Sequence, residues 1–346
     1  MSIEKLSTEE FILRGDKAVI LDVRSPGEYV HGHIPGAQSF PLFTDEERAI
    51  VGTLYSKSGK ESALFAGLDI VGAKMSAFVK KAKSLAPHKK VLVHCWRGGM
   101  RSAAIAWLLE FSGFDVKLLE GGYKSYRAYI RESFAKPSNI VILSGRTGSG
   151  KTDILKELVE MGEQILDLEG FANHKGSVFG HIGQAEQPSN EQFENDLADI
   201  WRKLDLNKRI WIEDESTRIG KITIPDTLFL SMKEASFIKI NIPLEFRVER
   251  LVREYAGVDD ESLIVDLLKL TDSLGNLAVQ EMTDMINEKN YKLFAMRILD
   301  YYDKRYDFSF SKKKGVLNQE INLVGKTTKE HAKELIKFMG QKCNAL

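Results

Sequence analysis

The sequence predicts two α/β domains in series, and two strand–loop–helix patterns carry that prediction. In the first, the apolar run at 91–93 leads through Cys95 into a glycine-containing loop, and a helical apolar pattern follows at 103–109. In the second, the apolar run at 140–143 leads into the glycine-rich stretch 145–150, which an amphipathic pattern follows. Strands that alternate with helices are typical of parallel α/β sheets. A chain of 346 residues is long enough for two such domains.

Cys95 is the first candidate catalytic residue, because its loop predicts an anion-binding site around the sulfur. The loop reads Cys-Trp-Arg-Gly-Gly-Met-Arg-Ser from Cys95 to Ser102. The backbone N–H groups of such a loop and the positive end of the following helix attract anions. Arg97 and Arg101 add full positive charges. We therefore expect Cys95 to be a nucleophilic thiolate with both arginines in its site. A buried structural cysteine is the alternative.

Two upstream motifs explain this loop. Asp-Val-Arg at 22–24 ends a short apolar strand, and Gly-His-Ile-Pro-Gly-Ala follows at 32–37. In this order and with a cysteine at a later strand tip, the motifs resemble the rhodanese family over residues 1–134. The resemblance implies an α/β domain that carries sulfur or selenium on the loop cysteine. We interpret Asp22, Arg24 and His33 as scaffold residues that pair to hold the loops.

The spacing inside the cysteine loop departs from that family. Cys95 and Arg101 are separated as Cys-x5-Arg, which is one residue longer than in common rhodaneses. The run His-Cys-x5-Arg-Ser also matches the signature of cysteine-dependent phosphatases. A longer loop encloses a larger anion, so this site is predicted to accept a tetrahedral phosphorus species. Phosphatase chemistry therefore stays open.

The second loop matches the P-loop pattern Gly-x4-Gly-Lys-Thr in full, between a strand pattern and a helix pattern as the motif requires. Its glycines let backbone N–H groups wrap a diphosphate, its lysine neutralises the charge, and its threonine can hold Mg²⁺. Residues 135–346 are thus predicted to be a P-loop NTPase-like α/β domain, with a helical C-terminal region after about Asp259. The predicted diphosphate-binding residues are Gly145, Arg146, Gly148, Ser149, Gly150, Lys151 and Thr152.

An acidic strand end and an arginine-bearing helix follow in the same domain. Glu213 and Asp214 end an apolar run, and in P-loop proteins an acid at this place supports Mg²⁺ or its waters. Which of the two does so stays open. Arg247 and Arg250 lie on a predicted helix of the kind that closes over phosphates in small P-loop kinases. A solvated basic face is the alternative reading of these arginines.

Basic and aromatic residues alternate just before the domain boundary near 134–139. Lys124, Arg127 and Arg131 are interleaved with tyrosines. Such a stretch can stack on bases and pair with phosphates of RNA. An ordinary helix that joins the domains explains the pattern equally well.

Composition excludes several classes of protein. The chain has 49 Lys and Arg residues and 49 Asp and Glu residues, so its net charge does not indicate a nucleic-acid partner. A local basic patch that binds nucleic acid stays possible. Two cysteines are too few for a disulfide framework or a cysteine-based zinc site. No stretch approaches ~18 continuous apolar residues, and the N-terminus lacks a signal-like run. We expect a cytoplasmic protein without membrane association.

Three longer strings sharpen the resemblance. They lie at 95–102, at 166–180 and at 213–220, where Glu-Asp-Glu-Ser precedes Ile-Gly. Together with the order of the two domains, they resemble the tRNA 2-selenouridine synthase family over essentially the full chain. The resemblance implies that the wobble 2-thiouridine of certain tRNAs is first S-alkylated with a geranyl group from geranyl diphosphate. Selenium from selenophosphate then displaces the S-geranyl group.

The same resemblance implies roles and partners. Cys95 would carry selenium as a selenopersulfide, and the P-loop would bind the donor diphosphate without hydrolysing a nucleotide. No tightly bound cofactor is expected, and Mg²⁺ can accompany the diphosphate. The implied partners are tRNA with a thiolated wobble position, selenophosphate, geranyl diphosphate and an enzyme that produces selenophosphate. Asp167, His174 and Lys175 become candidates for substrate contact, with ordinary hydrogen-bonded loop residues as the alternative.

Other functions remain open from the sequence alone. One is a cysteine-dependent phosphatase fused to a P-loop kinase, although no second motif identifies the acid that such phosphatases need. Another is an ATP-dependent tRNA sulfurtransferase, in which the P-loop activates the acceptor. A third is a non-catalytic tRNA-binding scaffold, which an intact cysteine loop disfavours. The sequence does not locate a chamber for the geranyl chain.

Overall fold

The computed structural model describes residues 3–311, 318–323 and 327–343, which form two compact units. Unit 1 comprises Met1–Ser133 with Glu194–Asp199, and unit 2 comprises Phe134–Phe193 with Ile200–Leu346. The segment that returns to unit 1 is the middle of helix α9 (Asn190–Trp201). Nothing in the sequence pattern predicted that return.

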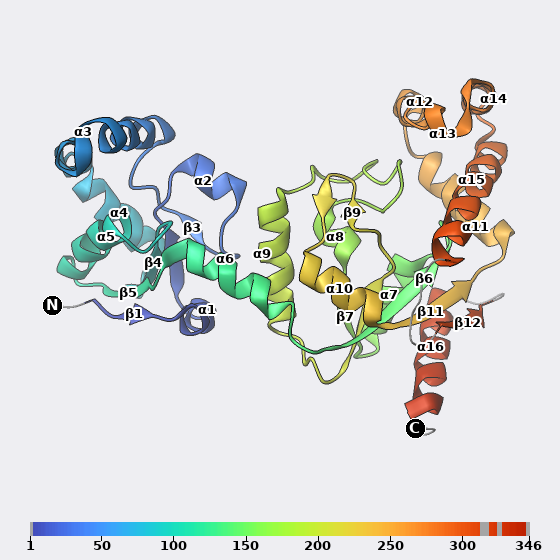
Figure 1. Cartoon of the computed structure of the whole chain (residues 1–346), viewed down its shortest axis with the longest axis horizontal. Coiled ribbons are helices and arrows are strands. Elements are labelled where there is room, and N and C mark those ends of the chain that lie inside the picture. The colour runs from blue at the N-terminus through green and yellow to red at the C-terminus, as the bar shows by residue number, and fades with distance from the viewer. Residues whose placement is uncertain (1–2, 312–317, 324–326, 344–346) are drawn as a thin grey trace. The chain divides into compact units, whose positions relative to one another are not determined.

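Unit 1 is built on a parallel sheet that has five strands within the described residues, in the order β1-β5-β4-β2-β3 (Figure 1). Its strands are β1 (Lys5–Leu6), β2 (Val19–Asp22), β3 (Gln38–Ser39), β4 (Lys90–His94) and β5 (Asp115–Leu119). Its helices are α1 (Thr8–Gly15), α2 (Pro26–His31), α3 (Asp45–Gly72), α4 (Met75–Leu85), α5 (Met100–Phe111) and α6 (Gly122–Ser133). β4 lies between β2 and β5, so Cys95 leaves the sheet from its middle strand.

The core of unit 1 explains the straight run of apolar residues in β4. Val91 and Val93 are buried with Phe78 of α4 and with Ile105 and Leu109 of α5. A strand that is buried on both faces is expected to have a continuous run of apolar residues, and β4 has one.

No single helix among the described residues is long and apolar enough to span a membrane. Helices α3 and α4 meet that test of length and composition only as a pair, which is bent by 63°.

The predicted scaffold residues of unit 1 do pair with one another. Arg24 donates to the carboxylate of Asp22 at 2.6 to 3.1 Å and to the carbonyl oxygen of Gly32 at 2.6 Å. Burial alone would raise the pKa of Asp22, but the neighbouring His94 and Arg24 hold that pKa below its ordinary value. His33 Nδ1 lies 3.0 Å from the carbonyl oxygen of Tyr29. The scaffold interpretation is therefore confirmed for the pair Asp22 and Arg24, and His33 contacts Tyr29.

Unit 2 also has a five-stranded parallel sheet among the described residues, in the order β12-β11-β6-β8-β7, and a small antiparallel β9–β10 pair. Its strands are β6 (Asn139–Gly145), β7 (Gln164–Leu166), β8 (Arg209–Glu213), β9 (Arg218–Ile219), β10 (Ile222–Thr223), β11 (Ser236–Asn241) and β12 (Asn318–Asn322). Its helices are α7 (Lys151–Glu160), α8 (Leu168–Ala172), α10 (Asp226–Glu234), α11 (Leu244–Tyr255), α12 (Asp260–Leu268), α13 (Thr271–Leu274), α14 (Asn276–Asn287), α15 (Tyr291–Ser311) and α16 (Thr328–Cys343).

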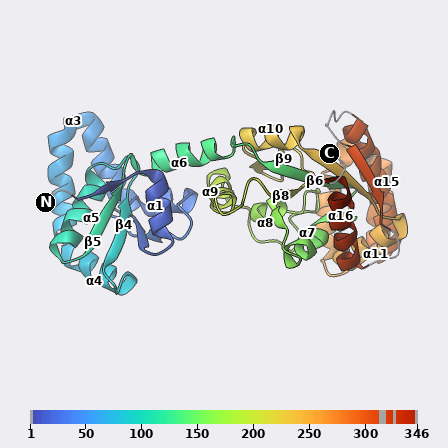
Figure 2. The same ribbon diagram turned by 90° about the horizontal axis from the view of Figure 1, so that it is seen from below.

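Two separate cores hold unit 2 together. Helices α7 and α16 pack side by side on the sheet, where Leu155 and Leu335 share one apolar cluster with Val141 of β6 (Figure 2). Helices α11, α12, α14 and α15 form a second cluster around Leu267 and Phe294. Figure 1 shows α12, α13 and α14 grouped away from the sheet of unit 2. The predicted α/β fold with a helical C-terminal region is confirmed.

Gly122 allows the first stability test, because its backbone lies against the cysteine loop with φ of 65°. A Cβ atom at Gly122 would lie 2.4 Å from both the Cys95 carbonyl oxygen and the Gly98 nitrogen. We expect Gly122→Ala to lower the free energy of unfolding by at least about 3 kcal/mol, since strain and overlap add.

Gly36→Ala is the matched control for Gly122→Ala. Gly36 has φ of 80°, but a Cβ atom there would meet nothing within 4 Å, so only the positive φ opposes the change. Its expected cost is about 1 kcal/mol. Urea denaturation measures both, and equal losses would contradict the close packing at Gly122.

Candidate functional site

The sulfur of Cys95 lies at the start of the cysteine loop, directly after β4. The residue is 3% exposed, and its Sγ lies 3.2 Å from the Oγ of Ser102 on α5. Ser102 Oγ also donates to the carbonyl oxygen of Gly99 at 3.1 Å. Ser102 therefore fixes the sulfur against the first turn of α5. The sequence contained Ser102 in the loop motif, but nothing in the motif indicated this contact.

The start of α6 holds the other side of the cysteine loop. The N–H groups of Tyr123 and Lys124 donate to the carbonyl oxygens of Cys95 and Trp96 at 2.8 and 2.9 Å. Gly98 takes φ of 65°, a conformation that favours glycine. The loop is thus held by backbone contacts from a segment that follows β5, well beyond the loop motif itself.

The two arginines of the cysteine loop differ in their surroundings. Arg101 Nη1 donates to Glu28 Oε2 at 2.8 Å, so Glu28 balances the Arg101 charge. Burial raises the pKa of Glu28, but its hydrogen bonds from Arg101 and the Ser25 N–H outweigh burial and lower that pKa. Arg97 is exposed. A role of Arg97 and Arg101 at the Cys95 sulfur stays a prediction.

The P-loop of unit 2 follows β6 and leads into α7. Gly148 and Gly150 take φ of 76° and 78°. Lys151 Nζ donates to the carbonyl oxygen of Gly145 at 3.0 Å, across the mouth of the loop. Ser149 Oγ is buried and makes no hydrogen bond within the described residues. Backbone N–H groups and one lysine are the elements that bind a diphosphate at such a loop.

A cavity of about 860 Å³ opens at this P-loop. Its polar side includes the P-loop residues Gly145, Thr147, Gly148, Gly150, Lys151 and Thr152, the basic residues Lys175 and Arg250, and the acidic residues Asp153, Glu169, Asp214, Glu215 and Glu254. Its apolar and aromatic side comprises Val178, Phe179, Ile182, Leu251, Tyr255, Val258, Leu270, Tyr301, Tyr302 and Tyr306. The second set comes from the 174–184 loop, α11, α15 and the turns that flank α12, none of which the P-loop motif identifies.

Two acidic residues of helix α15 pair with Arg146 and Arg247, the arginines that the sequence analysis assigned to phosphate binding. Arg146 donates to Asp307 at 2.7 and 3.2 Å. Arg247 donates to Asp303 at 2.6 and 2.8 Å and to the Thr147 carbonyl oxygen at 3.1 Å. Arg247 is only 3% exposed, so it belongs neither to a solvated face nor to the cavity wall. The Arg247 side chain therefore braces the P-loop, whereas contact of the Arg146 backbone N–H with a diphosphate stays a prediction.

Arg250 differs from Arg247, because it lines the cavity. Its guanidinium pairs with Asp153 of α7 and lies beside Gly150, where a Cβ atom would be 2.5 Å from Arg250 Nη2. The side chain is half-exposed at the edge of the P-loop. Arg250 therefore stays a candidate for contact with a bound diphosphate.

Carboxyl groups crowd the far side of the P-loop. Thr152 Oγ1 donates to Glu169 Oε2 at 3.0 Å, and the Glu169 N–H points to Glu213 Oε2 at 3.5 Å. Burial, together with the charges of Glu169 and Asp167, raises the pKa of Glu213 to about 8. Burial and the neighbouring Glu169 also raise the pKa of Glu215. These acids keep protons that exposed carboxyl groups would lose.

Thr152 and Glu213, two of the predicted Mg²⁺ ligands, lie within hydrogen-bonding reach of each other, and Asp214 lines the same cavity as Thr152. Thr152 donates to Glu169, and Asp214 accepts the hydroxyl proton of Ser144. Glu213 is fully buried, and within the described residues no group of three or more His, Cys, Asp or Glu side chains is arranged to hold a metal ion. Binding of Mg²⁺ by Thr152 with Glu213 or Asp214 stays a prediction, and no chemical step is assigned to Mg²⁺.

The three residues predicted to contact substrate, Asp167, His174 and Lys175, have different surroundings in the structure. Asp167 Oδ1 accepts the Gly170 N–H at 2.7 Å and caps α8. His174 is buried, its Nδ1 accepts the Gly176 N–H at 3.2 Å, and burial lowers its pKa. Lys175 alone of the three lines the cavity, with its Nζ 3.9 Å from Glu254 Oε2. Asp167 and His174 have local structural contacts, and Lys175 stays a ligand candidate.

The basic residues of α6 also have different surroundings. Arg127 is buried and donates to Asn195 Oδ1 at 2.5 Å and to Glu194. Arg131 Nε donates to the same Glu194 at 2.9 Å. Lys124 is exposed. The predicted phosphate contact is corrected for Arg127, which is buried in unit 1. Contacts of Lys124 and Arg131 with tRNA stay a prediction.

The raised pKa of Glu213 predicts a pH-dependent stability. The folded protein keeps this proton up to about pH 8, whereas an ordinary glutamate loses it near 4.5. Unfolding therefore releases a proton between these values. The free energy of unfolding should fall as pH rises from about 5 to about 8, by up to about 1.4 kcal/mol per pH unit.

Glu213→Gln should remove that contribution, because the amide does not titrate. Urea denaturation at several pH values in metal-free buffer measures the slope for wild type and variant. Glu160→Gln on the exposed surface of α7 is the control, and it should keep the wild-type slope. An unchanged slope in Glu213→Gln would show that Glu213 is ionised in the folded protein.

Comparison with known proteins agrees with both units. Residues 9–129 match the family model of the rhodanese-like domain, and residues 138–269 match that of the tRNA 2-selenouridine synthase AAA domain. The tRNA 2-selenouridine synthase of Shewanella denitrificans is 32% identical over 85% of this chain and 89% of that protein. That of Nitrosomonas europaea is 34% identical over 68% of this chain and 63% of that protein.

One solved structure is also similar to part of the chain. It is the crystal structure of an N-terminal domain from Clostridium difficile 630, which is 41% identical. The match covers 37% of this chain and 98% of that one, with a TM-score of 0.35. The family follows from the sequence relatives and the two domain matches: the chain belongs to the tRNA 2-selenouridine synthase family of tRNA-modifying transferases.

Proposed function

We propose that the protein converts wobble 2-thiouridine in tRNA to 2-selenouridine through S-geranyl-2-thiouridine. Geranyl diphosphate is the alkyl donor and selenophosphate is the selenium donor. Family membership supports the modification of tRNA to selenouridine. The observation that carries the rest of the proposal is the cavity of unit 2, in which a P-loop cradle opens onto an apolar and aromatic wall.

Alkylation comes first, because the sulfur of a thiocarbonyl is a poor leaving group. The sulfur attacks C1 of the geranyl group, the S–C bond forms, and the C1–O bond to diphosphate breaks. The base releases its N3 proton, and the diphosphate departs as an anion. Lys151 and the P-loop N–H groups lie where they can neutralise that anion, which favours departure.

Selenium transfer uses Cys95. The Cys95 thiolate attacks the selenium of selenophosphate, so that an S–Se bond forms, the Se–P bond breaks and the phosphorus group leaves as phosphite. The terminal selenium then attacks C2 of the modified base, the C2–Se bond forms, the C2–S bond breaks and the geranyl thiolate leaves. A small-molecule thiol reductant attacks the Cys95 sulfur and breaks the S–Se bond, which leaves selenium on the base, and a second equivalent of the thiol reduces the resulting mixed disulfide to free Cys95. The cysteine loop has the spacing that encloses a tetrahedral phosphorus anion, as selenophosphate is. Ser102 lies 3.2 Å from the sulfur and can support the carrier through a hydrogen bond.

Lys151→Ala tests the role of the P-loop. We expect the rate of geranylation to fall about a hundredfold or more, because the departing diphosphate loses its main positive charge. Mass spectrometry of nucleosides from thiolated tRNA measures S-geranyl-2-thiouridine. Pre-geranylated tRNA with selenophosphate should restore selenouridine formation by the same variant.

Lys208→Ala, an exposed lysine, is the control for Lys151→Ala and should geranylate normally. Normal geranylation by Lys151→Ala would remove the P-loop from this step. Consumption of ATP coupled to sulfur transfer in the wild-type protein would favour an ATP-dependent sulfurtransferase instead.

Cys95→Ser tests the selenium carrier. A hydroxyl keeps the loop shape but cannot form a selenopersulfide. We expect this variant to make S-geranyl-2-thiouridine at the wild-type rate and to form no 2-selenouridine, so that geranylated tRNA accumulates even with selenophosphate. Cys343→Ser makes the same change at the other cysteine of the chain and is the matched control, which should still form selenouridine.

A normal yield of selenouridine from Cys95→Ser would end the carrier mechanism. Cys95-dependent turnover of a simple aryl phosphate by the wild-type protein would favour the phosphatase alternative. Both readings use the same purified proteins, so one series of assays separates them.

A further inference from the structure

The cavity at the P-loop continues along one face of α11, and we infer that this continuation is the chamber for the terpenoid chain of the donor. The inference rests on the proposed function, since it assigns a place to the geranyl group. The floor of this chamber comprises Leu251, Tyr255 and Val258, and the walls of the chamber comprise Phe179, Ile182 and Leu270.

Contacts between α11 and the P-loop fix the diphosphate end of this chamber. Arg247 donates to the Thr147 carbonyl oxygen at 3.1 Å. A Cβ atom at Gly148 would lie 2.7 Å from Leu251 Cδ1, so Leu251 touches the P-loop backbone. The first two turns of α11 therefore lie against the loop that would hold the diphosphate.

The spacing along α11 orders the rest of the chamber. Arg247, Leu251 and Tyr255 recur every four residues and so share one helix face. Each turn advances about 5.4 Å, so Tyr255 lies about one turn beyond the P-loop contact at Leu251. Val258 follows in the turn after the helix, where its N–H donates to the Tyr255 carbonyl oxygen at 3.0 Å. The chamber thus runs from Leu251 toward Val258.

The side chains around Tyr255 suit an allylic hydrocarbon. The rings of Phe179, Tyr255 and Phe294 have centroids 5.5 to 6.0 Å apart and form a packed aromatic group. Burial of an apolar chain here gains roughly 25 cal/mol per Å². Aromatic faces also favour the positive charge that develops on the allylic carbon as the diphosphate departs.

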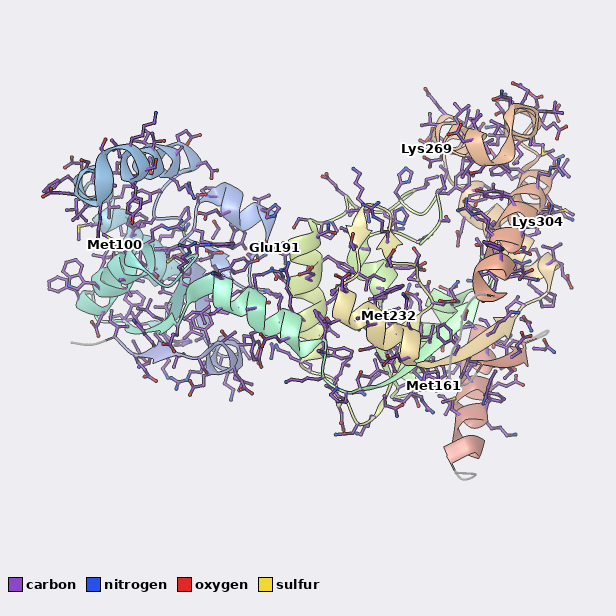
Figure 3. All side chains as sticks on the ribbon, viewed as in Figure 1. Met100, Met161, Glu191, Met232, Lys269 and Lys304 are labelled. Carbon is purple, nitrogen blue, oxygen red and sulfur yellow. The ribbon has the colours of Figure 1, made fainter. Side chains whose placement is uncertain are left out.

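The helical part of unit 2 closes the far end. Leu270 is buried and lines the cavity, whereas its neighbour Lys269 is exposed and donates to Asp266 at 2.7 Å. Figure 3 shows Lys269 beside α12 and Lys304 on α15, both on this helical part. Lys269 therefore does not line the cavity, whereas Val258 and Leu270 bring apolar groups to the far end of the chamber.

Val258→Trp tests the assignment by filling the far end. We expect the KM for geranyl diphosphate to rise about tenfold or more, because the second isoprene unit loses its place. Inhibition by inorganic diphosphate should not change, because the P-loop is untouched. Dimethylallyl diphosphate, which is one isoprene unit shorter, should keep its wild-type KM as a donor.

Two further variants make the test decisive. Val265→Trp introduces the same side chain on α12 at a position that is 51% exposed, and it should leave the KM for geranyl diphosphate unchanged. Val258→Ala enlarges the chamber, and it should raise the use of farnesyl diphosphate relative to geranyl diphosphate. This second variant tests the chamber without adding bulk to the fold.

The outcomes separate the chamber from the proposed function. A chain-length preference that is unchanged in both Val258→Trp and Val258→Ala, in a protein whose wild type transfers geranyl groups, overturns the chamber alone. A wild-type protein that transfers no geranyl group to thiolated tRNA overturns the proposed function, and the chamber assignment with it. Opposite shifts in preference for the two variants support the assignment.

Discussion

The backbones at the cysteine loop and at the P-loop pass closer to their neighbours than a side chain would allow, and the structure of each unit depends on that close approach. In unit 1, Gly122 brings the start of α6 against Cys95, so that N–H groups of α6 hold the cysteine loop. In unit 2, Gly148 brings the P-loop against Leu251 of α11. Glycine is needed at both places because φ is positive and space is absent. The same approach at Gly148 also directs α11 along the cavity.

The sequence allowed the prediction of both loops because strand, glycines and helix are contiguous in each motif. It did not allow prediction of what holds them. Asp303 of α15 braces the P-loop through Arg247, and Glu28 balances Arg101 of the cysteine loop. These acids lie far along the chain from the loops and belong to no periodic pattern. Arginines near an anion site were therefore assigned to ligands, although some of them serve as braces for the loop.

The protonation of the acidic residues around Thr152 could not be predicted from the sequence either, because their pKa values depend on burial in the folded protein. Glu213 and Glu215 are neighbours of Glu169 in space, and their pKa values are raised. A protonated carboxyl group repels a diphosphate far less than a carboxylate does, so these acids are compatible with an anionic ligand at Lys151. The raised pKa values at this acidic strand end follow from contacts in the fold that the sequence pattern alone does not show.

The central claim is that one protein performs both geranylation and selenium transfer on the same base. Mass spectrometry of wobble nucleosides measures this most directly, after the wild-type protein has been incubated with thiolated tRNA and geranyl diphosphate. Without selenophosphate, the account predicts S-geranyl-2-thiouridine as the product, and with selenophosphate it predicts 2-selenouridine. Formation of 2-selenouridine from thiolated tRNA and selenophosphate with no geranyl diphosphate present would contradict it.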